Sequence, residues 1–229
     1  MLQMRALSRT YRTDTIETSA LDTIDLDVLA GEFVALMGPT GCGKSTLLNV
    51  MGMLDSPSSG SYLFDGQEVA GLSEAKLAKL AKVRKASIGF IFQSFNLVDE
   101  LTVRENIELA LLYHPVPASE RKVRVEAVMD RVGIAHRARH RPSQLSGGRQ
   151  QRAAVAGALV AEPRLILADE PTGNLDTNHG EEVMRMLQTL NVAGSTIVIV
   201  THSPAHADHA SRAVSMLDGR ILQERRRAA

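Results

Sequence analysis

Residues 38–46 read Gly-Pro-Thr-Gly-Cys-Gly-Lys-Ser-Thr, and this segment restricts the fold more than any other part of the chain. It fits the pattern G-x-x-x-x-G-K-[ST], in which glycines let successive backbone N–H groups close around phosphate oxygens. Lys44 supplies a positive charge in that pattern, and the hydroxyl of Ser45 can bind magnesium. A short apolar run, Glu32–Met37, precedes the loop, and an apolar helical face, Leu47–Met51, follows it. This order of strand, loop and helix predicts an α/β fold built around a phosphate-binding loop.

Polar residues follow two further apolar runs, at the points where the expected strands end. Leu165–Ala168 and Thr196–Val200 are continuously hydrophobic, which is typical of parallel strands buried on both faces. Asp169 and Glu170 follow the first run, and His202 lies just beyond the second. Ligands in open α/β sheets gather at the carboxyl ends of the strands. We therefore expect these side chains to converge on the phosphates held by the loop.

Phosphoryl transfer suggests a role for each of these groups. Asp169 is predicted to hold a magnesium ion that Ser45 also contacts. Glu170, with its side chain aimed differently, is predicted to orient and deprotonate the attacking water. The ring N–H of His202 can donate to a γ-phosphate oxygen. The alternative is that the two carboxylates merely cap the end of a strand.

A second phrase, Leu-Ser-Gly-Gly at residues 145–148, precedes a helix expected from about residue 149 to 160. Ser146 is a good N-cap, and a helix start with two glycines can bind an anion. Lys44 already supplies one phosphate site in the chain. The second site is therefore predicted to cover the γ-phosphate held by another copy, with an ordinary capped helix as the alternative.

Gln93 and Tyr11 are weaker signals. Gln93 follows the strand-like segment Ile88–Phe92 and opens a helical region, so it can report the nucleotide state to that region. Tyr11 is one of 3 tyrosines and lies before the first expected strand. Its ring can either stack on adenine or pack into the flank of the core.

Composition limits the partners that the chain can have. The 229 residues, 44% of them hydrophobic, can bury a sizeable core. Because 26 Lys and Arg balance 26 Asp and Glu, no overall field draws the chain to nucleic acid, and none is expected as a partner. The only cysteine, Cys42, excludes an intrachain disulfide and suits the cytoplasm. No apolar stretch could span a bilayer and the N-terminus does not fit a signal peptide, so membrane work needs a partner.

The remaining segments predict two additions to the core. Residues 21–28 and 62–69 look like antiparallel strands, the second with an Asp-Gly hairpin turn. Helices are expected over residues 103–113, opened by a capping box, and 120–132. The predicted fold is α/β, a P-loop NTPase core of RecA type with an N-terminal antiparallel β subdomain and an inserted helical subdomain at about residues 94–162. All of it is expected to be one domain over residues 1–229.

Together these phrases resemble the ATP-binding cassette ATPases along essentially the whole chain. The matching motifs are Walker A at Gly38–Thr46, the Q-loop at Gln93, the signature at Leu145–Gly148, Walker B at Leu165–Glu170, the D-loop at Asn174–Asp176 and the switch histidine at His202. The resemblance implies that ATP is bound by Tyr11, Gly38, Pro39, Thr40, Gly41, Cys42, Gly43, Lys44, Ser45, Thr46, Ser146, Gly147, Gly148 and Asp176. It implies roles in hydrolysis for Lys44, Gln93, Glu170 and His202, and magnesium ligands at Ser45, Gln93 and Asp169.

The resemblance also implies partners. The chain is expected to form a head-to-tail homodimer with ATP, with two nucleotides at the interface. An integral membrane permease is expected to dock near Gln93–Leu101, which would hold the chain on the cytoplasmic face of the membrane. Segments 88–97, 101–106 and 169–177 look most like the lipoprotein-release, macrolide-efflux and cell-division subgroup, so export is the expected direction.

Three residues depart from the pattern of the resemblance: Arg149, Gly157 and Ser203. None of them removes a phosphate or metal contact, so ATP hydrolysis is expected, while its rate and the fit to a partner stay open. Two other functions also stay open. The chain could relay its nucleotide state through a membrane partner to an extracytoplasmic enzyme without transport, or it could be a soluble ABC ATPase.

Overall fold

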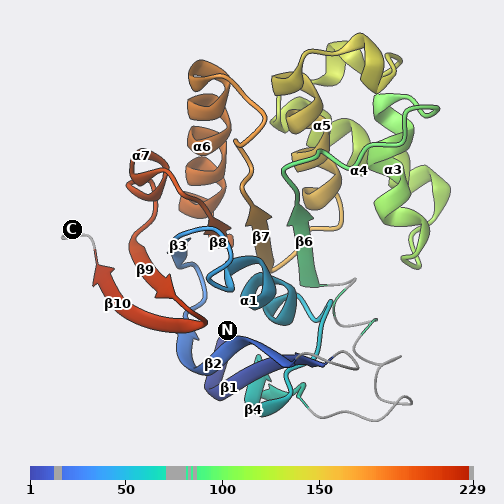
Figure 1. The fold of residues 1–229 in the computed structure, drawn as a ribbon. Coiled ribbons are helices and arrows are strands. Elements are labelled where there is room, and N and C mark those ends of the chain that lie inside the picture. Colours follow the sequence, from blue (N-terminus) through green and yellow to red (C-terminus); the bar gives the residue numbers. More distant parts are fainter. Residues whose placement is uncertain (13–16, 71–80, 82–83, 85–86, 227–229) are drawn as a thin grey trace.

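The computed structural model describes residues 1–229 except 13–16, 71–80, 82–83, 85–86 and 227–229. Its described strands form a six-stranded sheet of order β10-β9-β3-β8-β7-β6 and a four-stranded sheet of order β2-β1-β4-β5 (Figure 1). The strands are β1 (Leu2–Arg12), β2 (Glu17–Val28), β3 (Phe33–Met37), β4 (Ser59–Phe64), β5 (Gln67–Glu68), β6 (Ile88–Ile91), β7 (Leu165–Asp169), β8 (Thr196–Val200), β9 (Arg212–Leu217) and β10 (Arg220–Arg226). The helices are α1 (Lys44–Met51), α3 (Val103–Leu112), α4 (Ala118–Arg131), α5 (Gly147–Leu159), α6 (Thr177–Val192) and α7 (Pro204–Ala207), with short 3-10 turns η1 (Ala135–Arg137) and η2 (Pro142–Gln144).

The six-stranded sheet is the centre of the core. Strands β6, β7, β8, β3 and β9 pair in parallel, and β10 adds an antiparallel edge. On β3, Phe33 and Ala35 pack into a cluster with the helices, whereas Val34 and Leu36 pack into a second cluster with α1 and the four-stranded sheet. Both faces are therefore buried, which explains why these strands read as continuous apolar runs. The predicted fold class is confirmed.

Three helices form the lobe that stands beside the central sheet (Figure 1). They are α3, α4 and α5, and all of them lie between β6 and β7 in the chain. The predicted capping box opens α3, since Thr102 and Glu105 each bond the other's backbone N–H. Helix α4 begins at Ala118, two residues before its predicted start, and Gly133 follows its end with φ +72°. The limits of the helical subdomain at about 94 and 162, and the single domain over 1–229, stay predictions.

The N-terminal flank contains one more strand than the sequence predicted. Tyr11 does not precede the first strand but lies within β1, which pairs with both β2 and β4. Ala6 has φ +46°, and the register of β1 shifts between Met4 and Leu7. This irregularity interrupts the alternation of buried and exposed residues by which a strand is recognised.

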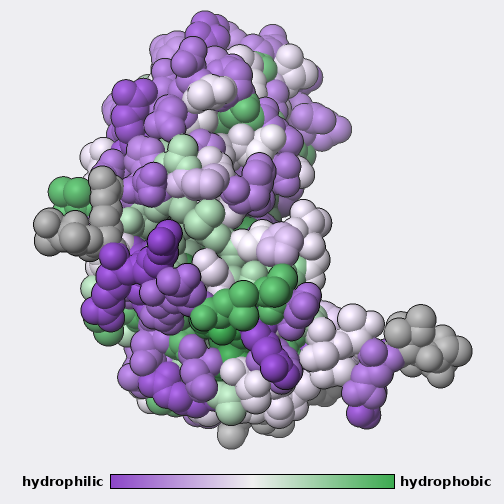
Figure 2. Space-filling model, turned by 60° about the vertical axis from the view of Figure 1, so that its left-hand side comes forward, coloured by the Kyte–Doolittle hydropathy of each residue, from purple (hydrophilic) through white to green (hydrophobic). Residues whose placement is uncertain are grey.

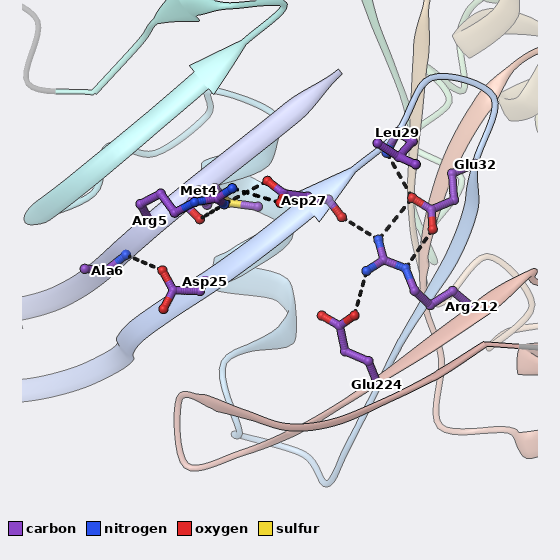
Figure 3. Close-up of polar contacts among 9 residues, drawn as sticks. All are labelled: Met4, Arg5, Ala6, Asp25, Asp27, Leu29, Glu32, Arg212 and Glu224. Atoms are coloured by element: carbon purple, nitrogen blue, oxygen red, sulfur yellow. Dashed lines mark hydrogen bonds and ion pairs between the residues drawn. The ribbon is translucent and has the colours of Figure 1, made fainter.

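A buried arginine joins the two sheets (Figure 3). Arg212, at the start of β9, is 4% exposed. Its Nε lies 2.7 Å from Oε1 of Glu32, before β3, and its Nη1 lies 2.8 Å from Oε2 of Glu224 on β10. Nη2 donates to the backbone carbonyl of Asp27 in β2. One guanidinium therefore contacts the four-stranded sheet through Asp27 and the side of the six-stranded sheet through Glu32 and Glu224.

Hydrophilic residues cover most of the face shown in Figure 2, and hydrophobic residues form a band across its lower half. Within the described part of the chain, no helix has both the length and the apolar character to cross a bilayer.

Candidate functional site

A cavity of about 450 Å³ opens where strands β6, β7 and β8 end and the loop after β3 begins. Gln93, Glu170 and His202 line it from the three strand ends. Most of the loop lines it from the other side, together with a short stretch of β2. The lining residues are Thr18, Ser19, Ala20, Thr40, Gly41, Gly43, Lys44, Ser45, Thr46, Gln93, Glu170, Val200 and His202. The structure thus brings together the loop and the polar strand ends that were expected to converge.

The loop is closed around its own lysine. Lys44 Nζ donates to the backbone carbonyls of Gly38 and Pro39, each at 2.8 Å, and only 8% of Lys44 is exposed. Gly38 has φ +150°, and a Cβ there would lie 2.3 Å from the carbonyl oxygen of Met216. Gly38 and Pro39 hold the lysine through their carbonyls and do not line the cavity. A bound phosphate would compete with these carbonyls for the ammonium group.

Cys42 is one of the loop residues expected to bind ATP, but it does not line the cavity. The side chain is 2% exposed and packs in the apolar cluster shared by α1 and the four-stranded sheet. A Cβ at Gly38 would meet its sulfur at 2.7 Å, so the thiol points inward beneath the loop. Any contact between Cys42 and a phosphate would therefore come from its backbone, because the motif fixes the backbone of this residue and not its side-chain direction.

The predicted magnesium ligands Ser45 and Asp169 lie beside each other. Ser45, in α1, donates through Oγ to Oδ1 of Asp169, at the end of β7, over 3.2 Å. Hydroxyl and carboxylate oxygens are donors that magnesium accepts. Among the described residues, no group of three or more His, Cys, Asp or Glu side chains forms a metal site by itself. A metal here would thus depend on these two side chains and on oxygens from a nucleotide.

Glu170 and His202 are held together at the ends of β7 and β8. His202 Nδ1 lies 3.0 Å from Glu170 Oε2. Glu170 has φ +44°, and its backbone N–H donates to the carbonyl of Val200 at 3.0 Å. Asp169 and Glu170 thus have different partners, since Asp169 meets Ser45 and Glu170 meets His202.

Gln93 is anchored to the segment that follows Glu170. Its backbone carbonyl accepts from Asn174 Nδ2 at 2.9 Å, and its Nε2 donates to Asn174 Oδ1 at 3.4 Å. A Cβ at Gly173 would lie 2.6 Å from Gln93 Nε2, so a larger residue there would displace the Gln93 side chain. Gln93 therefore contacts the cavity and the predicted D-loop at once.

Ser146, Gly148 and Asp176 do not join the first cavity. Ser146 and Gly148 line a second cavity of about 530 Å³ with Gly133, His136, Arg149, Arg152, His179 and Glu182. Ser146 is the N-cap residue of α5, as predicted, but its side chain makes no capping hydrogen bond, and Gly147 opens the helix. Asp176 is the N-cap of α6, and hydrogen bonds from His179 hold the pKa of its carboxyl below the usual range.

Tyr11 lies at the edge of the first cavity without lining it. It pairs in the sheet with Thr18, which does line the cavity. Its hydroxyl donates to Asp55 Oδ2 at 2.6 Å, and the guanidinium of Arg9 sits 4.5 Å from the ring centroid. One face of the ring is therefore occupied by Arg9, and an adenine would have to stack on the other.

An apolar cavity of about 360 Å³ lies between β6, α3 and α5, next to the predicted docking segment. Phe90, Phe92, Phe95 and Leu97 line it. Phe90 and Phe92 stack with their centroids 5.7 Å apart. A Cβ at Gly157, one of the residues that depart from the expected pattern, would meet nothing within 4 Å. This residue leaves the floor of the cavity open.

Several residues of the site could not be found from sequence. Thr18, Ser19 and Ala20 line the first cavity because β2 passes close to the loop, where a Cβ at Gly43 would lie 2.4 Å from the carbonyl of Ala20. Small polar residues in a strand carry no signal for such a contact. The partner of Gln93, Asn174, was identified only as part of the D-loop.

The family model for ABC transporters matches residues 21–173. The chain is 48% identical over 229 residues to a protein of Paracoccus denitrificans (strain Pd 1222) named macrolide export ATP-binding/permease protein MacB 1/2, and the match covers 100% of this chain and 34% of that protein. It is 46% identical over 222 residues to an uncharacterized ABC transporter ATP-binding protein, YknY, of Bacillus subtilis (strain 168), covering 97% of this chain and 95% of that protein. The chain spans about a third of the length of the macrolide-export relative.

A solved structure has the same fold. It is a dimeric, post-hydrolysis state of the ATP-binding cassette MJ0796 bound to ADP and phosphate, with a TM-score of 0.89 and 38% identity, covering 99% of this chain and 98% of that one. These similarities confirm the predicted resemblance to ATP-binding cassettes, and one of the relatives is named for macrolide export.

Proposed function

This chain belongs to the ABC transporter family, and we propose that it is the ATPase of a membrane exporter. As an ABC ATPase it binds and hydrolyses ATP. In the proposed cycle, two copies close head to tail on two ATP molecules and reopen after hydrolysis. A membrane permease converts that motion into movement of a substrate.

One observation carries the proposal of a closing dimer. The two groups of predicted phosphate-binding residues line separate cavities of the same chain. Lys44 and Ser45 lie in one, and Ser146 and Gly148 lie in the other. A single copy therefore cannot surround a γ-phosphate with both groups, whereas a second copy can supply the missing half. The dimeric state of the cassette MJ0796 supports the same arrangement.

The residues of the first cavity suit phosphoryl transfer. Lys44 would exchange the carbonyls of Gly38 and Pro39 for phosphate oxygens, to which it is a charge-assisted donor. Glu170 would accept the proton of the attacking water, and His202, already 3.0 Å away, would hold that carboxylate or donate to the γ-phosphate.

Ser45 and Asp169 fit a magnesium ion by their chemistry and their proximity, with Gln93 as a further proposed ligand. When bound, the ion would neutralise charge that develops on the phosphates.

We place the permease contact at Gln93–Leu101. The apolar cavity of about 360 Å³ borders this segment, so a docked partner would bury the aromatic side chains there. Gln93, which Asn174 holds by a hydrogen bond, would pass the nucleotide state to the docked permease. The relative whose name joins ATP-binding and permease supports a permease partner, in the same polypeptide or a separate one. The chain would then lie on the cytoplasmic face of the membrane.

Replacing Glu170 by Gln tests the proposal. An isosteric amide leaves Lys44, Ser45 and Asp169 in place, so ATP still binds, but hydrolysis should fall by a factor of about 100 because the general base is lost. Unhydrolysed ATP should then hold two copies together by mass action. Size-exclusion chromatography with light scattering should give a dimer with MgATP and a monomer with MgADP.

The matched control is Glu170→Gln/Ser146→Arg, which places bulk in the second cavity and should stay monomeric while binding ATP with the same affinity. A Glu170→Gln protein that is saturated with ATP and remains monomeric would contradict the shared site.

A further inference from the structure

His179 connects two of the residues that are proposed to face the partner copy. It lies in the first turn of α6, three residues after Asp176. Its backbone N–H donates to Asp176 Oδ1 at 3.0 Å, and its ring Nδ1 lies 2.6 Å from Asp176 Oδ2. Both carboxylate oxygens are therefore bonded to one residue, which leaves the Asp176 side chain a single orientation.

The other side of the imidazole ring lies on Gly148. A Cβ added at Gly148 would come within 2.5 Å of His179 Cδ2 and 2.9 Å of Cγ. Only a residue without a side chain can occupy this position while the ring keeps its place. The ring therefore sets how closely the start of α5 approaches the start of α6.

Charged groups surround this contact on several elements. Glu182, on α6, pairs with Arg152 of α5 at 2.9 Å, and that pairing keeps the pKa of Glu182 below its usual range. Arg149 and His136 line the same cavity of about 530 Å³. The carboxylate of Glu182 is thus hydrogen-bonded to Arg152, and the charge of His179 acts on it as well.

We propose that His179 is a positioning residue, which fixes Asp176 and Gly148 relative to each other before two copies meet. The proposal rests on the proposed dimer, in which these two residues belong to the surface that covers the partner's ATP. A preset spacing lowers the cost of ordering that surface on association. Loss of either contact should weaken the dimer and leave ATP binding by the single copy unchanged.

Two substitutions separate the contacts. His179→Phe keeps a ring against Gly148 and removes the ring donor to Asp176, while the backbone N–H still donates. His179→Asn keeps a short donor near Asp176 and removes most of the ring. Asn178→Ala, an exposed change in the same helical turn, is the matched control. All three are made in the Glu170→Gln protein, and dimerisation with MgATP is measured by light scattering over a range of protein concentrations.

We expect both His179 variants to raise the dimer dissociation constant about tenfold, as the loss of one charge-assisted hydrogen bond or one close contact does. Asn178→Ala should change it less than twofold. In the protein with Glu170 intact, turnover of the His179 variants should recover at high protein concentration with KM for ATP unchanged. Damage to the fold would instead lower turnover at every concentration.

Two results would overturn the inference, and they differ. If the Glu170→Gln parent dimerises and both His179 variants dimerise equally well, His179 has no positioning role and the proposed dimer stands. If the parent itself stays monomeric with ATP bound, the proposed dimer fails and the role of His179 fails with it.

Discussion

His202 Nδ1 and Glu170 Oε2 lie 3.0 Å apart at the ends of two neighbouring strands. The Glu170 side chain is 18% exposed and that of His202 is 74% exposed, so the carboxylate is largely buried and the ring lies on its solvent side. The backbone fixes the position of Glu170, since this residue has φ +44° and its N–H donates to the carbonyl of Val200. The ring therefore orients a carboxylate whose position the strand ends have already fixed.

His202→Ala should lower the rate of ATP hydrolysis by a factor of about 100, because a group that orients the base or donates to the transition state is lost. ATP affinity should change little. Because the two residues act as a unit, adding His202→Ala to Glu170→Gln should cost almost nothing more. Single-turnover rates for the two single variants and the double variant measure this. If the rate losses of the single variants multiply in the double variant, the two residues act independently and the prediction is wrong.

Cys42 should react slowly with thiol reagents in the folded protein. Its side chain is 2% exposed, so reaction requires local or global opening. We expect the folded protein to react about 100 times more slowly than the protein in denaturant, because opened states are rare. A fast reaction that MgATP blocks stoichiometrically would show instead that the thiol faces the nucleotide.

Asn106 should be important for stability, because it holds the end of the proposed docking segment to α3. It is 9% exposed. Its Oδ1 accepts from the Val98 N–H at 2.7 Å, and its Nδ2 lies 3.0–3.2 Å from the carbonyls of Val98, Leu101 and Thr102.

Asn106→Leu should lower the free energy of unfolding by about 2 kcal/mol, the cost of leaving buried backbone groups without partners. Chemical denaturation measures the change, with Val123→Ala on the exposed face of α4 as a control that should stay within about 0.5 kcal/mol of the parent. Equal stability of Asn106→Leu and the parent would show that solvent replaces these hydrogen bonds.

His206 should make stability depend on pH. Burial lowers the pKa of its ring below the usual value, Glu181 works against that effect, and its Nδ1 lies 3.0 Å from Thr172 Oγ1. Because the pKa is lower in the folded state, the contribution to stability is complete above the unfolded value of about 6.5 and is lost as the pH falls through the folded value.

The difference in unfolding free energy between the parent and His206→Gln isolates this residue from His202 and His209, whose charges act on its ring. The free energy of unfolding of the parent should fall relative to that of His206→Gln as the pH drops below about 6.5. Two parallel stability curves between pH 5 and 8 would contradict the expected sign.

The sequence predicted the elements whose signal is local. Leu165–Asp169 and Thr196–Val200 were found because strands buried on both faces have no polar positions to interrupt them. Strand β1 was missed because the positive φ of Ala6 breaks its alternation. The glycine pattern placed the loop, but it could not show that Cys42 turns inward, since the pattern constrains the backbone and leaves side-chain directions to the packing beneath it.

Contacts between distant segments were not predictable from a single sequence. Ala20 approaches Gly43, and Asn174 holds Gln93, because the tertiary fold places them together. The motif residues themselves carry a chemical signal, since phosphate and magnesium chemistry requires particular side chains at particular spacings. The residues that support them do not.

The buried guanidinium of Arg212 limits which parts of this molecule can move. Turning the four-stranded sheet against the six-stranded sheet would take the Asp27 carbonyl away from this guanidinium, whereas Glu32 and Glu224 lie with Arg212 on the side of the six-stranded sheet. Leaving a buried donor without its partner costs about 1–3 kcal/mol. This contact therefore resists rotation of one sheet against the other. We expect a stroke driven by ATP to move the helical lobe, or a whole second copy, about the two sheets.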